Sequence, residues 1–334
     1  MRGGSRRGLE NWQVATLVAA GGAGALALAN WMSRRSAGAV YNALDGEQAT
    51  FTWTYGGRPY DIAYKVKGRG MPLVLIHGVY AGASSFEYRS VFDAFAEQFR
   101  VYAFDLLGFG LSAHPPLVYT PILYESLIQD FITQVVGGVD HPVNVVASTL
   151  AAAFTIRAAA ERPSLFERLV LIEPTGIENL ADPTQTPGRR FALALLRMPV
   201  VGTALCNLIS SRLAIRFFLR QVYRDHRKIT GELVDYYYAQ AHQPAARFPL
   251  ASFVSGRLNT PVHDFFALLK QPVLLVWGKD ARLQPLERAQ AFRQSNPRAE
   301  LRVLDCGALP QDELPAEFVE EVGAWLRIPI RSGR

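Results

Sequence analysis

Short apolar segments alternate with amphipathic segments along most of the chain. The apolar segments are rich in aliphatic and aromatic residues, which is typical of strands that are buried on both faces. These predicted strands span residues 72–77, 100–105, 143–148, 168–173, 272–277 and 300–305. Helical periodicity predicts helices over residues 85–99, 121–136, 149–160, 285–294 and 315–326. Because strands and helices alternate, we expect a mostly parallel sheet that is covered by helices on both faces.

A different pattern precedes the first buried strand. Ala49–Tyr55 and Pro59–Lys65 alternate between apolar and polar residues, and they flank the pair Gly56-Gly57. Two alternating segments joined by a glycine pair are typical of a β-hairpin. The sheet is therefore expected to begin with a hairpin.

The alternation of strands and helices stops between residues 173 and 272. Helical patterns follow one another there, over residues 189–198, 203–228 and 232–242. We therefore predict a helical cap over 177–262, inserted between two parts of one α/β core, 45–176 and 263–330. A chain of 334 residues has room for a domain of this kind with an insertion.

Residues 1–44 form a separate N-terminal segment. Trp12–Trp31 contains no charged residue, is long enough to span a bilayer as a helix, and has a tryptophan at each end. The same segment also fits a signal peptide that is cleaved after Ala27-Leu28-Ala29. Both alternatives stay open: a single membrane anchor, or export followed by cleavage. Either one places the chain at or across a membrane.

The net charge of +6 is unevenly distributed. Residues 1–44 carry five Arg and one Glu, which gives +4, and residues 177–262 carry eleven Lys or Arg and five Asp or Glu, which gives +6. The rest of the chain therefore carries 6 − 10 = −4. This pattern favours an anionic membrane surface as a partner. No helix-turn-helix, RNP or zinc-finger pattern indicates nucleic acid.

A basic stripe falls within the predicted cap helix 203–228. Its arginines recur every four residues, at Arg212, Arg216, Arg220 and Arg224. A basic stripe on an amphipathic helix is suited to contact with anionic lipid. The alternative is a face of the cap helix that is simply solvated, and the sequence leaves the two open.

Metal ions and cofactors have no signature in this sequence. Cys206 and Cys306 have no Cys or His neighbour at metal-ligand spacing, and they are expected either to pair or to be two buried thiols. The loop Gly108-Phe109-Gly110 lacks the third glycine of a dinucleotide-binding motif. We therefore expect no metal and no cofactor.

The junction between residues 148 and 149 is the candidate site. A buried strand turns abruptly into an Ala-rich helix there, which is the form of a nucleophile elbow. If Thr149 is at the corner, the flanking positions are Ala147 and Ala151, which allow strand and helix to approach closely. If Ser148 is at the corner, the flanks are bulkier. We therefore place Thr149 in the nucleophile position, although a β-branched residue is strained there.

Several further motifs follow the same order as in a known superfamily. They are His77-Gly78, Ala81–Phe86, Asp105–Ser112, the corner at Thr149, Trp277–Pro285 and Cys306–Pro315. With these motifs, residues 50–327 resemble the α/β-hydrolase superfamily, in particular its bacterial and plastid members with a helical cap. The resemblance implies an α/β-hydrolase fold. Activity has to be argued from the site itself.

The resemblance also implies the places of a Ser–Asp–His triad, which needs a nucleophile, a base and an orienting carboxylate. The nucleophile position holds Thr149, the acid position holds Ala281 and the histidine position holds Ala308. Two carboxylates lie nearby in the sequence, Asp280 one residue before the acid position and Glu173 at a strand end. Neither replaces the missing base, and a threonine hydroxyl without a base is a poor nucleophile.

The backbone part of such a site does not depend on these side chains. The resemblance implies an oxyanion hole at Gly78, Val79 and Leu150, whose N–H groups are suited to a carbonyl or carboxylate. We therefore expect a membrane-associated binding protein for a small apolar acyl or ester-like molecule, with little or no serine-hydrolase activity. The alternative is an active ester or lipid hydrolase that pairs Ser148 or Thr149 with His114 or with a histidine of the cap.

Overall fold

The computed structural model describes residues 11–138 and 141–327, and for residues 11–21 it describes only the helical backbone. Its centre is an eight-stranded sheet with the strand order β1-β2-β4-β3-β5-β6-β7-β8. The strands are β1 (Glu47–Tyr55), β2 (Arg58–Lys67), β3 (Pro72–Ile76), β4 (Arg100–Phe104), β5 (Val143–Ser148), β6 (Phe166–Ile172), β7 (Val273–Gly278) and β8 (Glu300–Leu304).

The sheet is parallel from β4 to β8, and two antiparallel ladders complete it at one edge. β1 and β2 form the hairpin around Gly56-Gly57, and β2 pairs with β4 in antiparallel register. The central ladders align Ile76 with Ala147 and Ser148 with Ile172. Since β3, β5, β6 and β7 are buried almost along their whole length, their carboxyl ends meet inside the molecule.

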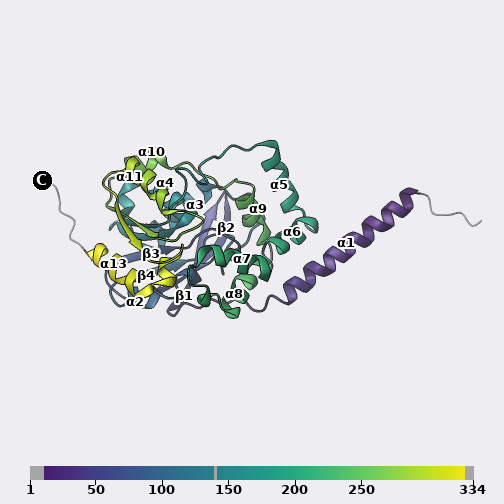
Figure 1. Ribbon diagram of the computed structural model, residues 1–334, viewed down its shortest axis with the longest axis horizontal. Helices are drawn as coiled ribbons and strands as arrows, with labels where there is room; N and C mark the ends of the chain where they lie inside the picture. The colour runs from purple at the N-terminus through teal and green to yellow at the C-terminus, as the bar shows by residue number, and fades with distance from the viewer. Residues whose placement is uncertain (1–10, 139–140, 328–334) are drawn as a thin grey trace, which may run out of the picture.

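Helices cover both faces of this sheet (Figure 1), which confirms the predicted α/β-hydrolase fold. One layer contains α3 (Pro121–Phe131), α4 (Thr149–Glu161), α10 (His263–Leu268) and α11 (Ala289–Ser295). The other contains α2 (Phe92–Ala96) and α13 (Pro315–Arg327), and the short α12 (Pro310–Glu313) precedes α13. Two separate apolar clusters, one on each face, form the core.

Five helices follow one another within the predicted cap, between β6 and β7. They are α5 (Pro187–Arg197), α6 (Val201–Ile209), α7 (Arg212–Val222), α8 (Gly231–Ala241) and α9 (Arg247–Val254). The single helix predicted over 203–228 is wrong. Ser210 ends α6, and the Ser211 hydroxyl accepts a hydrogen bond of 3.3 Å from the N–H of Ala214 to begin α7. A serine that caps a new helix competes with continuation of the old one.

The helix predicted over 85–99 is also interrupted. A short 3₁₀ helix spans Ser85–Tyr88, and α2 begins only at Phe92. The helix predicted over 121–136 ends as an α-helix at Phe131 and continues as one π turn, Ile132–Val136. These local departures leave the order of strands and helices unchanged.

The N-terminal segment forms the helix α1 (Asn11–Arg35), which projects from the side of the cap (Figure 1). Among the described residues, no single helix is both long and apolar enough to cross a bilayer. The pair α5 and α6, which is bent by 100°, reaches that length and composition only when the two are taken together. Cys206 and Cys306 are both free and buried, so the disulfide alternative is not realised.

Close backbone contact at the carboxyl ends of β7 and β8 makes one glycine irreplaceable. A Cβ on Gly278 would lie 1.8 Å from the carbonyl oxygen of Gly307, whereas a Cβ on Gly323 in α13 would meet nothing closer than 3.8 Å. We expect Gly278→Ala to lower the free energy of unfolding by about 3 kcal/mol or more, as overpacking against a fixed backbone does. Gly323→Ala is expected to raise it by about 0.5–1 kcal/mol, because alanine favours the helix.

Urea denaturation of the two variants beside the wild type measures both effects. Equal stability of Gly278→Ala and the wild type would contradict the close approach of these two strand ends.

Candidate functional site at the β5–α4 corner

The corner between β5 and α4 is strained at one residue. Thr149 has a φ of 48°, in the left-handed region, whereas Ser148 has an extended backbone with a φ of −109°. Ala147 and Ala151 are fully buried on either side of the corner. The structure therefore places Thr149 rather than Ser148 at the strained position. A β-branched residue in this region costs about 1–3 kcal/mol, which the surrounding structure has to offset.

The Thr149 hydroxyl lies against the loop that follows β3. A Cβ on Gly78 would be 2.7 Å from Thr149 Oγ1 and 3.3 Å from Glu87 Oε2, so a side chain at position 78 would require Thr149 Oγ1 to move. Within the described part of the chain, the N–H groups of Val79 and Leu150 have no hydrogen-bond acceptor. Two backbone donors therefore lie next to Thr149 without an acceptor.

Glu87 occupies the centre of this site, and sequence reasoning missed it. Its side chain is only 1% exposed. Its Oε2 accepts hydrogen bonds from the N–H of Gly78 and from the Tyr80 hydroxyl, both at 2.9 Å, and its Oε1 accepts one from Gln311 Nε2 at 2.8 Å. Glu87 thus links the loop after β3 to α12, at the other end of the sequence. A lone Glu in the motif S-S-F-E-Y carries no signal of these partners.

Burial raises the pKa of Glu87, and the Ser148 hydroxyl, the N–H of Gly78, Tyr80 and Gln311 partly oppose the rise by hydrogen bonding to the carboxyl. The Ser148 hydroxyl is buried beside this carboxyl and has no hydrogen bond to any other group in the described structure. A carboxyl group at this position brings acceptors, and negative charge when it ionises, to the place where an oxyanion would form. That is opposite to the donor-rich surroundings that stabilise an oxyanion.

Ala281 and Ala308 lie at the two loops predicted to carry the acid and the histidine. Both are buried, and each is 5% exposed. The N–H of Ala308 donates a 2.7 Å hydrogen bond to the carbonyl oxygen of Val222, at the end of cap helix α7. The cap therefore lies directly over the position that would hold the histidine.

Two more buried glutamates bind the same loops through backbone N–H groups. Glu313 Oε2 accepts from the N–H of Gly307 at 2.6 Å, and its Oε1 accepts from the N–H groups of Arg224 and Asp225. Glu173 Oε1 accepts from the N–H of Gly278 at 3.1 Å. Burial raises the pKa of Glu173 well above its usual range, and the nearby Glu313 raises it further. Neither glutamate contacts a histidine.

Asp280, the second alternate carboxylate, points away from the corner. Its side chain is about half exposed and forms a 2.9 Å ion pair with Arg224, which also pairs with Asp305. Asp280 is therefore part of a surface ion-pair network.

The ring nitrogens of the buried histidines are bound elsewhere. His77 donates from Nδ1 to the carbonyl oxygen of Gly78 at 2.7 Å, and its Nε2 accepts from the N–H of Leu106 at 3.0 Å, so it holds two loops together. His242 Nδ1 donates to the carbonyl oxygen of Tyr238 at 2.8 Å.

The remaining histidines are also away from the corner. His226 contacts the carbonyl oxygen of Arg220 at the surface, and His141 and His263 are exposed. Burial lowers the pKa of the partly buried His114, which lies close to Asp105. Within the described chain, which contains all six histidines, no hydrogen bond joins an imidazole to Thr149 or Ser148.

The cap closes over the site through aromatic side chains of α8. Tyr237 Oη lies 3.4 Å from Tyr80 Oη, and the ring of Tyr236 stacks on Phe86 with 3.7 Å between the ring centres. A Cβ on Gly82 would be 2.4 Å from the carbonyl oxygen of Tyr237, so the loop after β3 touches the backbone of the cap.

Comparison with known proteins supports the fold described above. The sequence profile described as "Alpha/beta hydrolase family" matches residues 73–321, from β3 into α13. The chain belongs to the α/β-hydrolase family. The resemblance stated from the sequence motifs is thereby confirmed.

Curated members of the α/β-hydrolase family resemble this chain over most of its length. It is 26% identical to 2-hydroxy-6-oxo-6-(2'-aminophenyl)hexa-2,4-dienoic acid hydrolase of Metapseudomonas resinovorans, over 69% of this chain and 74% of that protein. It is also 26% identical to an uncharacterized protein of Mycobacterium tuberculosis, over 80% of this chain and 78% of the relative.

Solved α/β-hydrolase structures have the same fold. A serine hydrolase involved in carbazole degradation matches with a TM-score of 0.69 at 24% identity, over 85% of this chain and all of that one. A bacterial membrane phospholipase A matches with a TM-score of 0.64 at 21% identity, over 94% of this chain and 96% of that one. The second match covers all but about 20 of the 334 residues. The segment before β1 is longer than that, so the match includes part of it.

The buried carboxyl of Glu173 makes the stability of this α/β-hydrolase-family chain depend on pH. Its pKa is higher in the folded chain than its usual value of 4.5, so above that pH the unfolded chain releases a proton that the folded chain retains, and stability falls as pH rises. We expect Glu173→Gln to match the wild type near pH 4 and to become progressively more stable than the wild type as pH rises to 7.5. Denaturation across this pH range measures the difference.

The glutamine keeps an amide oxygen for the N–H of Gly278, so the variant removes charge and preserves the hydrogen bond. Glu287→Gln, at an exposed position, is the matched control, and its stability relative to the wild type is expected not to change with pH. A constant difference between Glu173→Gln and the wild type at every pH would refute the assignment.

Proposed function

We propose that this α/β-hydrolase-family chain binds a small acyl or carbonyl compound and does not hydrolyse it by serine-hydrolase chemistry. One observation carries the proposal: no imidazole in the described chain is hydrogen-bonded to the Thr149 or Ser148 hydroxyl. A hydroxyl nucleophile needs a base within about 2.6–3.2 Å to take its proton. Without one, the corner retains the form of a nucleophile site but lacks its proton transfer.

The negative charge that the Glu87 carboxyl carries when it ionises supports the same conclusion. In a serine hydrolase, negative charge develops on the substrate oxygen, and donors have to face it. Here a buried carboxyl already holds the N–H of Gly78, which leaves Val79 and Leu150 as the donors without an acceptor. Two backbone N–H groups suffice to orient a carbonyl oxygen in its ground state.

The competing function is an active ester or lipid hydrolase with a rearranged site. The strained backbone of Thr149 favours this alternative, because strained residues cluster at functional sites. Against it, the partly buried His114 bonds to the backbone of Ser112, and no hydrogen bond in the described chain joins its ring to Thr149 or Ser148. The carboxylate oxygens of Asp105, which acts on His114, accept from the backbone N–H groups of Ser85 and Leu111.

Labelling with a fluorophosphonate probe distinguishes the two functions. We expect the purified full chain to remain unlabelled at both Thr149 and Ser148, because no imidazole is hydrogen-bonded to either hydroxyl in the described chain. An active serine esterase in parallel is the positive control, and Thr149→Ala is the matched variant. Labelling of Thr149 or Ser148 at a rate comparable to the esterase, detected by mass spectrometry of the peptide, would overturn the proposal.

Restoring the missing groups tests whether the geometry is vestigial. We expect the combined substitutions Thr149→Ser, Ala281→Asp and Ala308→His, with Glu87→Gln, to hydrolyse short acyl esters at least about tenfold faster than the wild type, a small part of what a complete triad contributes. The same substitutions without Ala308→His serve as the control. A wild type as active as the full combination would show that its own groups already form a working site.

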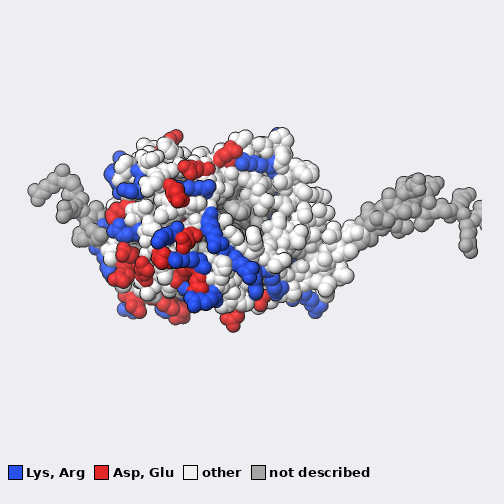
Figure 2. Space-filling view, in the orientation of Figure 1, with Lys and Arg blue, Asp and Glu red and all other residues white. Residues whose placement is uncertain are grey.

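We propose in addition that the chain is held at a membrane by its N-terminal segment. Large apolar side chains on the described part of α1 are exposed, including Leu28 at 57% and Met32 at 58%. The neighbouring cap helices α6 and α7 expose Leu208, Leu213 and Phe217. Figure 2 shows that the part of the molecule around α5, α6 and α1 bears few charges, while Lys and Arg gather beside it over α7.

The end of α1 is held on the cap by hydrogen bonds. Asn30 donates to the carbonyl oxygen of Val200 and accepts from Asn207 Nδ2, both at 3.0 Å. Arg212 donates to the carbonyl oxygen of Ser36 at 3.0 Å. These contacts lie after Ala29, so both an anchored chain and a chain cleaved at that site would keep them.

Alkaline extraction of membranes from cells that express the full chain separates the two alternatives. We expect the protein to stay in the membrane fraction with an N-terminus upstream of Trp12, as determined by mass spectrometry, because an apolar helix resists extraction. Release into the soluble fraction with an N-terminus near Asn30 would instead establish a cleaved signal.

A further inference from the structure

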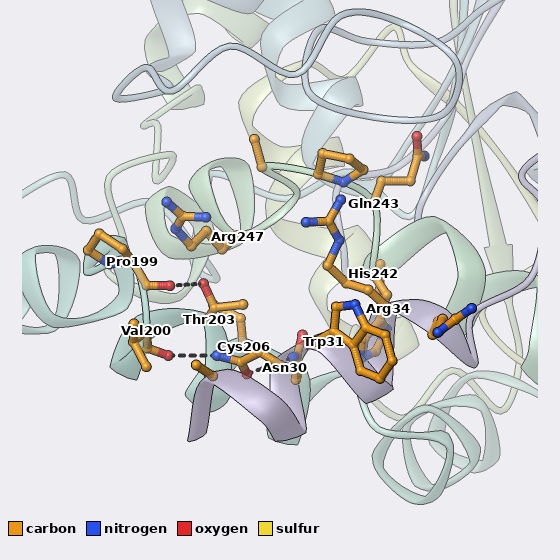
Figure 3. A pocket seen from close by; sticks show the side chains of 16 residues that line it. Asn30, Trp31, Arg34, Pro199, Val200, Thr203, Cys206, His242, Gln243 and Arg247 are labelled. Atoms are coloured by element: carbon orange, nitrogen blue, oxygen red, sulfur yellow. Dashed lines mark hydrogen bonds between the residues drawn. The ribbon is translucent and has the colours of Figure 1, made fainter. Parts of the chain in front are cut away.

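A second cavity lies away from the β5–α4 corner, where α1 meets the cap (Figure 3). Its volume is about 600 Å³, and its walls come from the last turns of α1, from the start of α6, and from the segment between α8 and α9. Trp31 of α1 forms one wall, and Arg34 and Arg247 lie on opposite sides in Figure 3. The cavity shares no lining residue with the corner at Thr149.

The charges around this cavity are of one sign. Three arginines line it, Arg34, Arg35 and Arg247, and no Asp or Glu does. Within the described part of the chain, none of the three forms an ion pair with a carboxylate. Arg35 rests over the ring of Trp31 and Arg247 over the ring of Phe248, with 4.8 and 4.3 Å to the ring centres, so these two guanidinium groups contact aromatic rings and not a carboxylate.

Two buried polar atoms in the wall also have no partner in the described structure. The Nε of Arg247 is one of them, and burial lowers the pKa of this guanidinium. The other is Nε2 of His242, whose side chain is only 4% exposed and whose Nδ1 is already bound to the carbonyl oxygen of Tyr238. Buried polar atoms are normally hydrogen-bonded. The Nε of Arg247 is a donor without an acceptor, so it points to an acceptor supplied from outside the chain, and the arginines that line the cavity favour an anion.

We propose that this cavity binds a phosphate group. A phosphate has enough oxygens to accept from the guanidinium groups of Arg34 and Arg247 at once, and arginine recognises phosphate through paired, charge-assisted hydrogen bonds. Burial lowers the pKa of His242, so its free Nε2 is an acceptor and is suited to a hydroxyl group of a phosphate ester. The Thr203 and Asn207 side chains, which also line the cavity, are already bound to Pro199 and Asn30 and hold the wall in place.

The size and setting of the cavity indicate a phosphate ester. About 600 Å³ is more than a bare phosphate fills, so a glycerol or similar group is accommodated beside it. The exposed apolar residues of α1, Leu28 and Met32, continue from the rim of the cavity along the helix. Both a soluble phosphate ester and a phospholipid head group present this chemistry.

Two binding experiments on the full chain distinguish these sources. Calorimetric titration with inorganic phosphate and with glycerol 3-phosphate tests the soluble source. Flotation with phosphatidylcholine vesicles that contain phosphatidic acid tests the lipid source, and vesicles with oleate, matched in surface charge, show what charge alone contributes. Saturable binding in the first experiment, or a preference for phosphatidic acid over oleate in the second, is the expected result and identifies the source.

Substitutions assign the binding to the cavity. We expect Arg247→Gln to weaken binding about tenfold or more, since it removes a charge-assisted hydrogen bond from a buried site. Arg34→Gln, on the exposed side of the cavity, is expected to act in the same direction without affecting the fold. Arg216→Gln removes an equal charge from α7 outside the cavity and is expected to change binding less than about twofold, as a distant exposed charge does.

Two results would overturn the proposal. One is the absence of saturable binding to either soluble phosphate compound together with equal flotation on phosphatidic acid and oleate vesicles. The other is an equal loss of binding in Arg216→Gln and in the two cavity variants, which would show general attraction to a positive surface. Neither result bears on the acyl-binding site at Thr149.

Discussion

Close backbone approach at the carboxyl ends of the central strands is the constraint on which the site depends. Gly278 has no room for a side chain because the carbonyl oxygen of Gly307 would lie 1.8 Å from its Cβ, and a Cβ on Gly78 would lie 2.7 Å from the side-chain atom Thr149 Oγ1, which would have to move. Interiors packed to this density deform little. The loops after β3, β5, β7 and β8 are therefore fixed against one another. That explains how a strained threonine persists at the corner, since its neighbours leave it no other conformation.

Buried glutamates complete this arrangement where a catalytic triad would otherwise join the same loops. Glu87, Glu173 and Glu313 each accept a hydrogen bond from a strand-end glycine, Gly78, Gly278 and Gly307 respectively. Each bond satisfies a backbone donor that would be costly to leave unpaired. On the function proposed above, these acidic groups stand where hydrolysis would require a base and hydrogen-bond donors.

The sequence predicted most of this fold because its strands are buried on both faces. Such strands are continuous apolar segments, and their ends meet at one edge whatever lies between them. The sequence also predicted that Thr149 occupies the corner, because its flanking residues Ala147 and Ala151 are small enough to let the strand and the helix approach closely. The helix predicted over 203–228 was wrong as a continuous helix because Ser211 caps a new helix there, and this local hydrogen bond competes with continuation of the first. The helix predicted over 85–99 breaks near Ser90, whose hydroxyl bonds to the distant Asp312, a contact that the sequence does not indicate.

The contacts of Glu87 lay beyond sequence reasoning for a different reason. Its partner Gln311 is 224 residues away, and neither residue type is unusual on the surface of a helix. Apolar periodicity indicates which face of an element is buried, but it does not indicate which polar side chain is buried with that face. The same limit applies to the cavity beside α1, where Arg34 and Arg247 are brought together only by the docking of α1 on the cap.

That docking connects the two positively charged parts of the chain. Residues 1–44 carry a charge of +4 and residues 177–262 carry +6, while the remainder is negative by 4. Asn30 is 9% exposed and bridges to α6, and Arg212 reaches the carbonyl oxygen of Ser36, so the end of α1 has a fixed orientation on the cap. The basic residues of both parts therefore lie beside the same exposed apolar side chains. An anionic surface or head group that meets the end of α1 meets the cap as well, and the like charges gathered there repel one another less once an anion lies between them.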